Sequence, residues 1–313
     1  MKKQNAPRSK PARLNYADTI GIVAPASSFD AENFRKGVKM LRKTGNKVKY
    51  ERSIFNKCWS QPGHDKQRAA QINRMFADKE VKAIFCAKAG YGAADIIPYL
   101  DKKIIRQNPK IFVGYSDITT LLLYLQKEAE IVVFHGPVVS GEMYEGMNPL
   151  TLEYLKKLIT SPAPFGEISF PQLKVIRPGK AKGVLAGGNL SLIVDSLGKS
   201  YEIDTADKVL FLEDVGENTE DIRGYFIKLK QADKFKTIKA LMFGRMLDCF
   251  DEQSGLLDIL DEFFPGSDIP IISRFPAGHI KTAEELNFTL PLGVEISIDT
   301  NIPLLEITES AVK

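Results

Sequence analysis

The sequence predicts an α/β protein, with an N-terminal doubly wound parallel-sheet domain followed by a β-rich α/β C-terminal domain. In the first half, short continuous apolar runs alternate with amphipathic stretches, which is the pattern of parallel strands covered by helices on both faces. Near the C-terminus, apolar and polar residues alternate within short runs, as in antiparallel strands. A segment rich in proline and glycine separates the two patterns. We therefore expect domains at 1–160 and 181–313, joined by a linker at 161–180.

Four apolar runs of the first half predict parallel strands. These runs are IGIVAP (20–25), VKAIFCA (81–87), KIFVGYS (110–116) and IVVFHG (131–136). Apolar residues recur at helical spacing within 34–41 and 69–76, and the stretch at 119–127 is also helical in pattern. Strands and helices that alternate in this order form a doubly wound sheet.

The second half predicts further strands and helices, followed by a β-rich tail. The runs VLFLE (209–213) and ALMFG (240–244) read as strands. Helical patterns occupy SLIVDSL (191–197), DIRGYFIKLK (221–230) and SGLLDILDEFF (254–264). We expect the tail to form β-hairpins from PIISRF (270–275), LNFTL (286–290) and VEISID (294–299).

Composition excludes several classes of function. Lys and Arg total 43 and Asp and Glu total 39, so the net charge is only +4, which argues against binding to nucleic acid or to a membrane surface. Cys58, Cys86 and Cys249 form neither a disulfide framework nor a metal-ligand spacing. No apolar run is long enough to cross a bilayer or to act as a signal peptide. We therefore expect a cytoplasmic protein.

Ser116 is the candidate nucleophile. It follows the apolar run KIFV in the sequence Gly114-Tyr115-Ser116-Asp117 and precedes a helical stretch. A serine on a sharp strand-to-helix turn presents its hydroxyl at the sheet edge, beside backbone N–H groups that can bind an oxyanion. The match to the G-x-S-x-G elbow is partial, because Ile118 occupies the last position. In the alternative interpretation, Ser116 or Asp117 only caps the helix.

A serine nucleophile requires a base, and the chain has 3 histidines. His64 lies in a polar loop, which indicates a surface residue. His135 ends an apolar run, whereas His279 lies in the irregular loop PAGHI. The pattern alone leaves the choice between His135 and His279 open.

Glu213 is the candidate partner of the base, because it ends the apolar run VLFLE, where a carboxylate is costly to bury. Acidic residues continue after it at 214, 217, 220 and 221. This cluster is compatible with Mg²⁺ or Ca²⁺ binding, but the later acids also fit the acidic first turn of a helix.

A glycine-containing loop, Lys88-Ala89-Gly90-Tyr91-Gly92, follows the run AIFCA. Its G-x-G-x-x-D pattern lacks the third glycine of a dinucleotide site, so it predicts such a site only weakly. Its backbone amides are instead placed to face Ser116 across the sheet edge.

Several short motifs together resemble the serine LD-carboxypeptidase family, which includes the microcin C self-immunity peptidases. The resemblance extends from about residue 14 to the last strands. The motifs are DTIGIVAPASS, the Gly63–Asp65–Arg68 spacing, KAGYG, PYLD, VGYSD, FHGP, AGGNLSLI, LFLEDVGE and PAGH.

This resemblance implies a catalytic triad of Ser116, Glu213 and His279, which selects His279 over His135. It also implies an oxyanion hole made by the backbone N–H groups of Asp117 and Gly90. The family uses no metal or organic cofactor, and its members often form homodimers.

The substrate implied is a murein tetrapeptide, from which the enzyme removes terminal D-Ala during cell-wall recycling. Lys88 and Tyr91 are the expected substrate-binding residues. The family loop usually reads R-G-G-Y-G-x-x-R, whereas this chain has Lys88, Ala89 and Asp95 at three of those positions. The alternatives are a microcin-immunity-like peptidase that acts on a peptidyl-nucleotide analogue, or a non-catalytic α/β protein that binds peptides or nucleotides.

Overall fold

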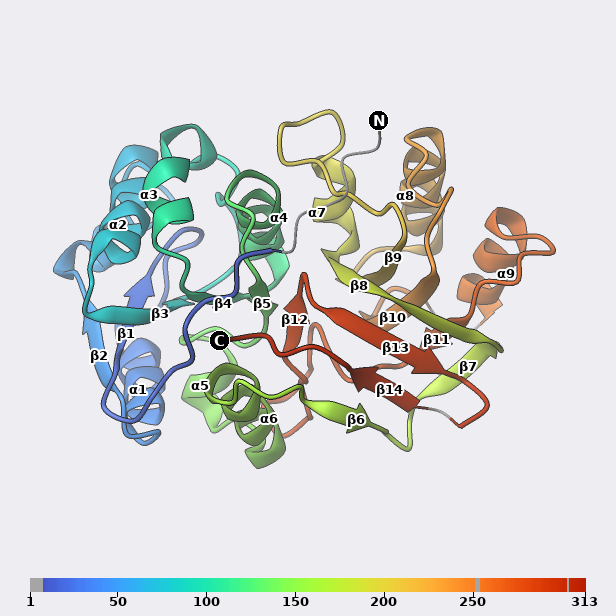
Figure 1. Cartoon of the computed structure of the whole chain (residues 1–313). Helices are drawn as coiled ribbons and strands as arrows, with labels where there is room; N and C mark the ends of the chain where they lie inside the picture. The colour runs from blue at the N-terminus through green and yellow to red at the C-terminus, as the bar shows by residue number, and fades with distance from the viewer. Residues whose placement is uncertain (1–7, 251–253, 303) are drawn as a thin grey trace.

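The computed structural model describes residues 8–250, 254–302 and 304–313, which form two sheets side by side (Figure 1). Within these residues, the first sheet has the strand order β12-β5-β4-β3-β1-β2. Its strands are β1 (Thr19–Val23), β2 (Lys47–Tyr50), β3 (Val81–Cys86), β4 (Ile111–Gly114), β5 (Val133–His135) and β12 (Leu290–Leu292). Strands β1 to β5 run parallel, and β12 is antiparallel to β5. This arrangement confirms the doubly wound N-terminal sheet.

Helices connect and cover the strands of the first sheet. They are α1 (Ala31–Arg42), α2 (Asp65–Ala77), α3 (Lys102–Gln107), α4 (Thr119–Glu128), α5 (Glu142–Glu145) and α6 (Pro149–Thr160). Asp30 caps α1, since its carboxylate accepts the N–H groups of Glu32 and Asn33. Helix α4 is buried along most of its length, in agreement with its apolar sequence.

The second sheet is mixed, with the order β6-β14-β13-β8-β9-β10-β11-β7 among the described strands. Their bounds are β6 (Gly166–Ile168), β7 (Lys174–Arg177), β8 (Lys180–Asn189), β9 (Lys208–Val215), β10 (Ala240–Leu247), β11 (Ile271–Ser273), β13 (Glu295–Asp299) and β14 (Leu304–Ile307). Strands β8 to β11 are parallel and the outer strands are antiparallel. The helices of this half are α7 (Leu190–Asp195), α8 (Thr219–Gln231) and α9 (Ser254–Phe263).

The segment 161–180 contains structure of its own. Strand β6 pairs with β14 at one edge of the second sheet, and β7 pairs with β11 at the other. Both strands are short and lie at edges, where proline and glycine are tolerated. The division into domains at 1–160 and 181–313 remains a prediction.

The expectation of β-hairpins in the tail is wrong for two of the three runs. Run 294–299 does form a hairpin, in which β13 pairs with β14. Run 270–275 instead supplies β11, which is parallel to β10. Run 286–290 leads into β12, which pairs with β5 at the edge of the first sheet, on the side of the second sheet (Figure 1). Alternation of apolar residues identifies a strand but not its partner.

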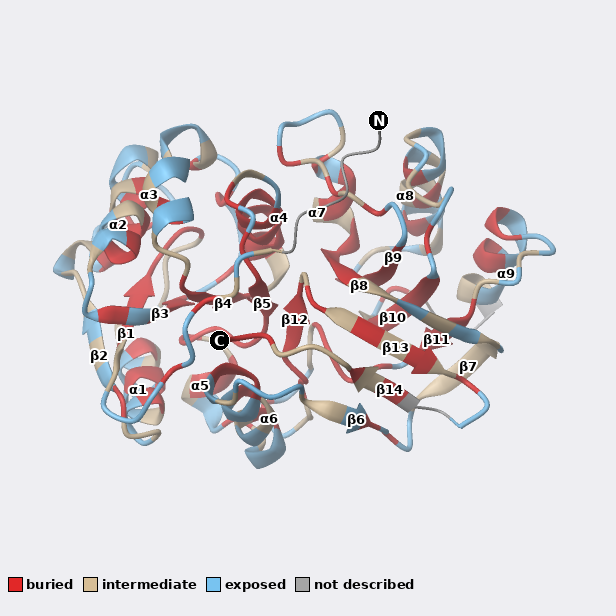
Figure 2. Cartoon of the chain, in the orientation of Figure 1, coloured by how far each residue is buried: buried red, intermediate tan, exposed pale blue. Residues whose placement is uncertain are grey.

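The central strands of both sheets form the buried interior, whereas the edge strands β2, β6 and β7 and the outer faces of the helices are partly exposed (Figure 2). An aromatic cluster connects the two halves. Its members are Tyr154, Phe165, Phe170, Phe275 and Phe288, with neighbouring ring centroids 5.3 to 6.3 Å apart. Since Phe275 stands just before the loop that carries His279, this packing helps to fix that loop.

Candidate active site

Ser116 lies on a sharp turn between β4 and α4. Its φ of 58° is in the left-handed region, which costs about 1–3 kcal/mol for a residue other than glycine. Gly114 makes the turn possible, since a Cβ there would approach Cγ2 of Ile118 to 2.7 Å. Residues Ser116–Ile118 then form a 3₁₀ turn that leads into the helix. This is the geometry of a nucleophile elbow, although Ile118 replaces the usual second glycine.

The side chain of Asp117 braces this turn. It is buried, and its Oδ2 accepts the N–H of Ala93 at 2.9 Å. Burial raises the pKa of Asp117 to about 6, and the charge of Asp95 acts in the same direction. The hydrogen bond from Ala93 opposes this rise. Asp117 therefore links the turn at Ser116 to the end of the glycine loop through its side chain, a role that the sequence did not reveal.

Arg68 is fully buried and connects the glycine loop to the turn after β1. Its Nη1 donates to the carbonyl of Gly92 at 2.9 Å and to that of Pro25, and its Nη2 donates to Oδ1 of Asp65 at 2.6 Å. The sequence indicated Arg68 only as part of the Gly63–Asp65–Arg68 motif that resembles the family, without a role for its side chain. Two of its partners, Pro25 and Gly92, lie far away along the chain, so the sequence alone does not reveal this role.

His279 lies between Ser116 and Glu213. Its Nε2 is 3.0 Å from Oγ of Ser116, and its Nδ1 is 2.8 Å from Oε2 of Glu213. The backbone N–H of His279 also donates to Oε2 of Glu213, at 3.2 Å. Glu213 is buried within β9, two residues before the strand ends at Val215. The structure thus brings the three predicted residues together in one hydrogen-bonded series.

Charge and burial act in opposite directions on Glu213 and His279. Burial alone would raise the pKa of Glu213, but its contacts with His135 and His279 outweigh this effect and lower the pKa to about 2. Burial alone would lower the pKa of His279, but the hydrogen bond and charge of Glu213 raise it above the ordinary 6.5. The carboxylate is therefore ionised at neutral pH and stabilises a proton on His279.

His135, the other candidate base, is on the far side of Glu213. It is the last residue of β5, and its Nε2 lies 3.5 Å from Oε1 of Glu213. The described residues provide no hydrogen bond between His135 and Ser116. The geometry therefore pairs Ser116 with His279.

The glycine loop lies beside the turn after β1. Gly90 has a φ of +116°, and a Cβ there would lie 2.3 Å from Oγ of Ser27. The N–H of Tyr91 donates to the same Oγ at 3.0 Å, while the N–H of Gly90 has no hydrogen bond among the described residues. The side chains of Lys88 and Tyr91 are exposed, Tyr91 to 68%. Both are free to meet a ligand.

A second exposed aromatic residue occurs in a neighbouring loop. Trp59 is 95% exposed and lies between Cys58 and Gln61, which form an isolated β-bridge. The loop is tied to the turn after β1, because the N–H of Ser28 donates to the carbonyl of Ser60 at 2.7 Å.

The acids that follow Glu213 have structural roles. Asp214 accepts from the side chain of Asn189 and the N–H of Ser191, at 2.9 and 2.8 Å. Glu220 and Asp221 lie in the first turn of α8, which confirms that these later acids begin a helix. In the part of the chain that the structure describes, no group of three or more His, Cys, Asp or Glu side chains is arranged to hold a metal ion.

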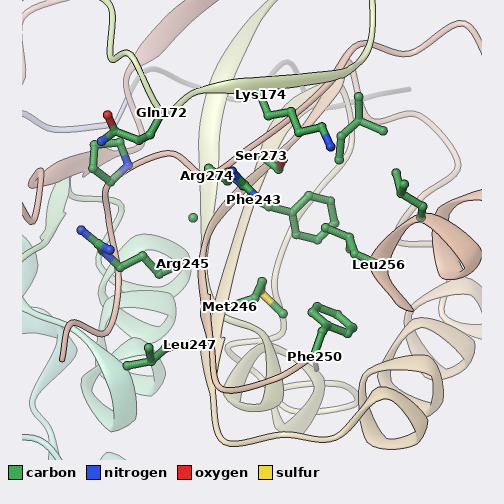
Figure 3. A pocket seen from close by; sticks show the side chains of 14 residues that line it. Gln172, Lys174, Phe243, Arg245, Met246, Leu247, Phe250, Leu256, Ser273 and Arg274 are labelled. Atoms are coloured by element: carbon green, nitrogen blue, oxygen red, sulfur yellow. The ribbon is translucent and has the colours of Figure 1, made fainter. Parts of the chain in front are cut away.

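A pocket of about 510 Å³ lies at the carboxyl ends of β10 and β11, beside α9 (Figure 3). Phe243, Met246 and Phe250 form apolar walls, and Arg245 lies nearby. The backbone N–H of Arg245 donates to the carbonyl of Ala277 at 2.9 Å. The pocket therefore borders the loop that carries His279, but Ser116, Glu213 and His279 do not line it.

Comparison with known proteins identifies the family. Residues 20–136 match the model of the LD-carboxypeptidase N-terminal domain, and residues 182–298 match that of the LD-carboxypeptidase C-terminal domain. The chain belongs to the LD-carboxypeptidase family. As a family member it is a serine-type carboxypeptidase, a hydrolase.

Individual LD-carboxypeptidase relatives cover nearly the whole chain. A probable murein peptide carboxypeptidase of Bacillus subtilis is 33% identical over 93% of this chain and 92% of its own length. The microcin C7 self-immunity protein MccF of Escherichia coli is 28% identical over 95% of both chains. A crystal structure of an MccF-like protein from Bacillus anthracis has a TM-score of 0.87 and 27% identity, over 96% of this chain and 99% of that one. No helix among the described residues is long and apolar enough to span a membrane.

Proposed function

We propose that this protein removes the terminal D-Ala from murein tetrapeptides through an acyl-enzyme on Ser116. The observation that carries the proposal is the position of His279, within hydrogen-bonding distance of both Oγ of Ser116 and Oε2 of Glu213. A serine hydroxyl becomes a useful nucleophile only when an oriented base is present to take its proton. The B. subtilis relative, named a probable murein peptide carboxypeptidase, supports the choice of substrate.

In this mechanism, Oγ of Ser116 attacks the carbonyl carbon of the scissile amide while His279 takes the hydroxyl proton. Glu213 holds the imidazole in place and stabilises its positive charge. His279 then gives the proton to the leaving nitrogen of D-Ala, and an acyl-enzyme remains. Water, activated by the same histidine, releases the shortened peptide.

We assign the oxyanion hole to the backbone N–H groups of Asp117 and Gly90. Asp117 lies at the start of the turn into α4, and the N–H of Gly90 lacks a partner among the described residues. Loss of one such donor typically costs about 3–4 kcal/mol of transition-state stabilisation. We assign Lys88 to bind the terminal carboxylate of the peptide through its single ammonium group, in contrast to the bidentate contact that an arginine would make. Tyr91 is assigned to pack against the apolar surface of the peptide.

The same proposal includes a cytoplasmic homodimer that acts in peptidoglycan recycling. The cytoplasmic location and the dimer rest on the sequence and its family resemblance alone, whereas the name of the B. subtilis relative supports only the action on murein peptides.

The test is the release of free D-Ala from purified murein tetrapeptide. We expect the wild-type protein to release D-Ala and to be labelled at Ser116 by a fluorophosphonate probe. Ser116→Ala should lower release by about 10⁴-fold or more and abolish labelling. Ser297→Ala is a matched control, since its Oγ donates to Glu306 in the second sheet, and this variant should behave as wild type.

The same preparation separates the alternatives. Labelling of Ser116 without D-Ala release, combined with hydrolysis of a peptidyl-nucleotide analogue, would favour the MccF-like activity suggested by the relatives. Absence of both labelling and hydrolysis in the folded protein would contradict a serine peptidase and favour a binding protein.

A further inference from the structure

The two oxygens of the Glu213 carboxylate have different partners. Oε2 accepts both the Nδ1–H and the backbone N–H of His279, at 2.8 and 3.2 Å. Oε1 is buried and makes no hydrogen bond within the described residues. An ionised oxygen without a donor is costly in a buried site. It also leaves the carboxylate free to turn, because its terminal torsion is soft.

His135 is the side chain that faces this oxygen. It is 1% exposed, and neither ring nitrogen has a hydrogen bond among the described residues. Its Nε2 lies 3.5 Å from Oε1 of Glu213. The two unpartnered groups are thus next to each other in a buried place, where water cannot easily replace either one.

The ring of His135 is held in position by its surroundings. It packs edge-on against Phe211, with ring centroids 5.3 Å apart, and against Tyr115, at 5.8 Å. Its backbone is fixed on both sides, since β5 pairs Gly114 with His135 on one edge and Leu290 with His135 on the other. The ring therefore cannot turn far from Glu213 without disturbing β4 or β12.

We propose that His135 is a positioning residue of the reaction, whose Nε2–H donates to Oε1 of Glu213. With both oxygens held, the carboxylate keeps one orientation toward His279 throughout the proton transfers. The separation of 3.5 Å is long for a hydrogen bond, but such bonds in free enzymes often tighten only when charge develops. This role rests on the proposed function, because it acts through His279.

The experiment compares three substitutions in the full-length protein. His135→Leu removes the donor. His135→Gln keeps an amide N–H near the position of Nε2, whereas His135→Asn places its amide near that of Nδ1, out of reach of Glu213. We expect His135→Leu and His135→Asn to lower kcat for D-Ala release by about 10- to 100-fold with KM unchanged. His135→Gln should stay within about threefold of wild type.

A second readout does not depend on the peptide. The rate at which a fluorophosphonate labels Ser116 measures activation of the nucleophile alone, and it should fall in the same order as kcat. In a Glu213→Gln background, His135→Leu should lower the labelling rate by less than about a further threefold. The effects of two substitutions are not additive when one residue acts through the other. Phe134→Leu is the packing control. This change affects a buried neighbour on the same strand, so it should lower thermal stability but leave the labelling rate unchanged.

The outcomes keep the two proposals apart. If wild-type Ser116 is not labelled and no D-Ala appears, the proposed function itself fails. If wild type is active and folded His135→Leu matches it in both rates, the role of His135 is refuted. If His135→Leu does not fold, the comparison of Gln with Asn decides, and equal rates for these two polar variants overturn the inference.

Discussion

The protonation of His279 is the chemical variable on which the proposed reaction depends. Glu213 raises the pKa of His279 above 6.5, although burial acts in the opposite direction. His279 can accept the proton of Ser116 only in its neutral form. Activity is therefore expected to appear as the pH rises through this raised pKa, and the carboxylate stays ionised throughout because its own pKa is about 2.

We predict that kcat/KM falls on the acid side with an apparent pKa above 6.5. Glu213→Gln removes the charge that raises the pKa of His279, so the acid limb should move to lower pH while the maximal rate drops. The measurement is a pH series of D-Ala release at fixed ionic strength. An acid limb that stays in place in Glu213→Gln would contradict the assignment.

The assignment of the acid limb to His279 needs a control, because Asp117 has a pKa of about 6 and could titrate at a similar pH. Asp117→Asn keeps an oxygen that can accept the N–H of Ala93 and leaves the backbone N–H intact. We expect this variant to show the wild-type acid limb. A limb that disappears in Asp117→Asn would belong to Asp117 instead of His279.

At the scale of elements, the loop after β11 is built closely around Glu213. Gly278 has a φ of +110°, and a Cβ there would lie 2.5 Å from Oε2 of Glu213. Its N–H donates to Oδ1 of Asn287 at 3.1 Å, which fixes the turn. The absence of a side chain at 278 is thus what allows His279 and Glu213 to meet.

We predict that Gly278→Ala lowers kcat by at least about 100-fold, because a displacement of about 1 Å between catalytic groups is enough for such a loss. Gly216→Ala is the matched control. It also has a left-handed φ, of +72°, but its Cβ would meet nothing within 4 Å. Gly216→Ala should lose about 1 kcal/mol of stability from its backbone alone, Gly278→Ala should lose more because of the added clash, and only Gly278→Ala should lose activity. Equal activities would refute the steric argument.

Elements that depend on local pattern could be predicted from the sequence, whereas partners distant along the chain could not. The apolar run before Ser116 and the break at Gly114 predicted a sharp strand-to-helix turn, and the structure has such a turn. The choice between His135 and His279 required the family resemblance, because His279 and Ser116 are separated by 163 residues. Strand β2, with the sequence KVKY, was missed because an edge strand lacks a continuous apolar run.

At the scale of the whole molecule, the two sheets share structure. Strand β12 is preceded by Phe288 of the aromatic cluster and followed by β13 of the second sheet, yet it pairs with β5 of the first. The N-terminal segment is also paired with the last residue, since Arg13 donates to Lys313 and Lys313 donates to Pro11. The first sheet is thus completed by a strand from the second half of the chain, whereas the described strands of the second sheet all lie within 166–307.

We predict that the two halves unfold together. Differential scanning calorimetry should give one transition, with a calorimetric enthalpy equal to the van't Hoff enthalpy, because β12 completes the first sheet and leads directly into β13 of the second. Far-UV and near-UV circular dichroism should have the same midpoint. Two resolved transitions would show that β12 and the aromatic cluster do not couple the halves.

The position of Trp59 determines what tryptophan fluorescence can report. It is the only tryptophan in the sequence, and nearly all of its surface is in contact with solvent. Its emission maximum in the native state should therefore already be close to that of an indole in water. Unfolding of the protein should shift this wavelength little. Trp59 is therefore a sensitive fluorescent probe of the loop at 58–61. A ligand that binds near this loop should quench the tryptophan emission, and no other tryptophan contributes to that signal.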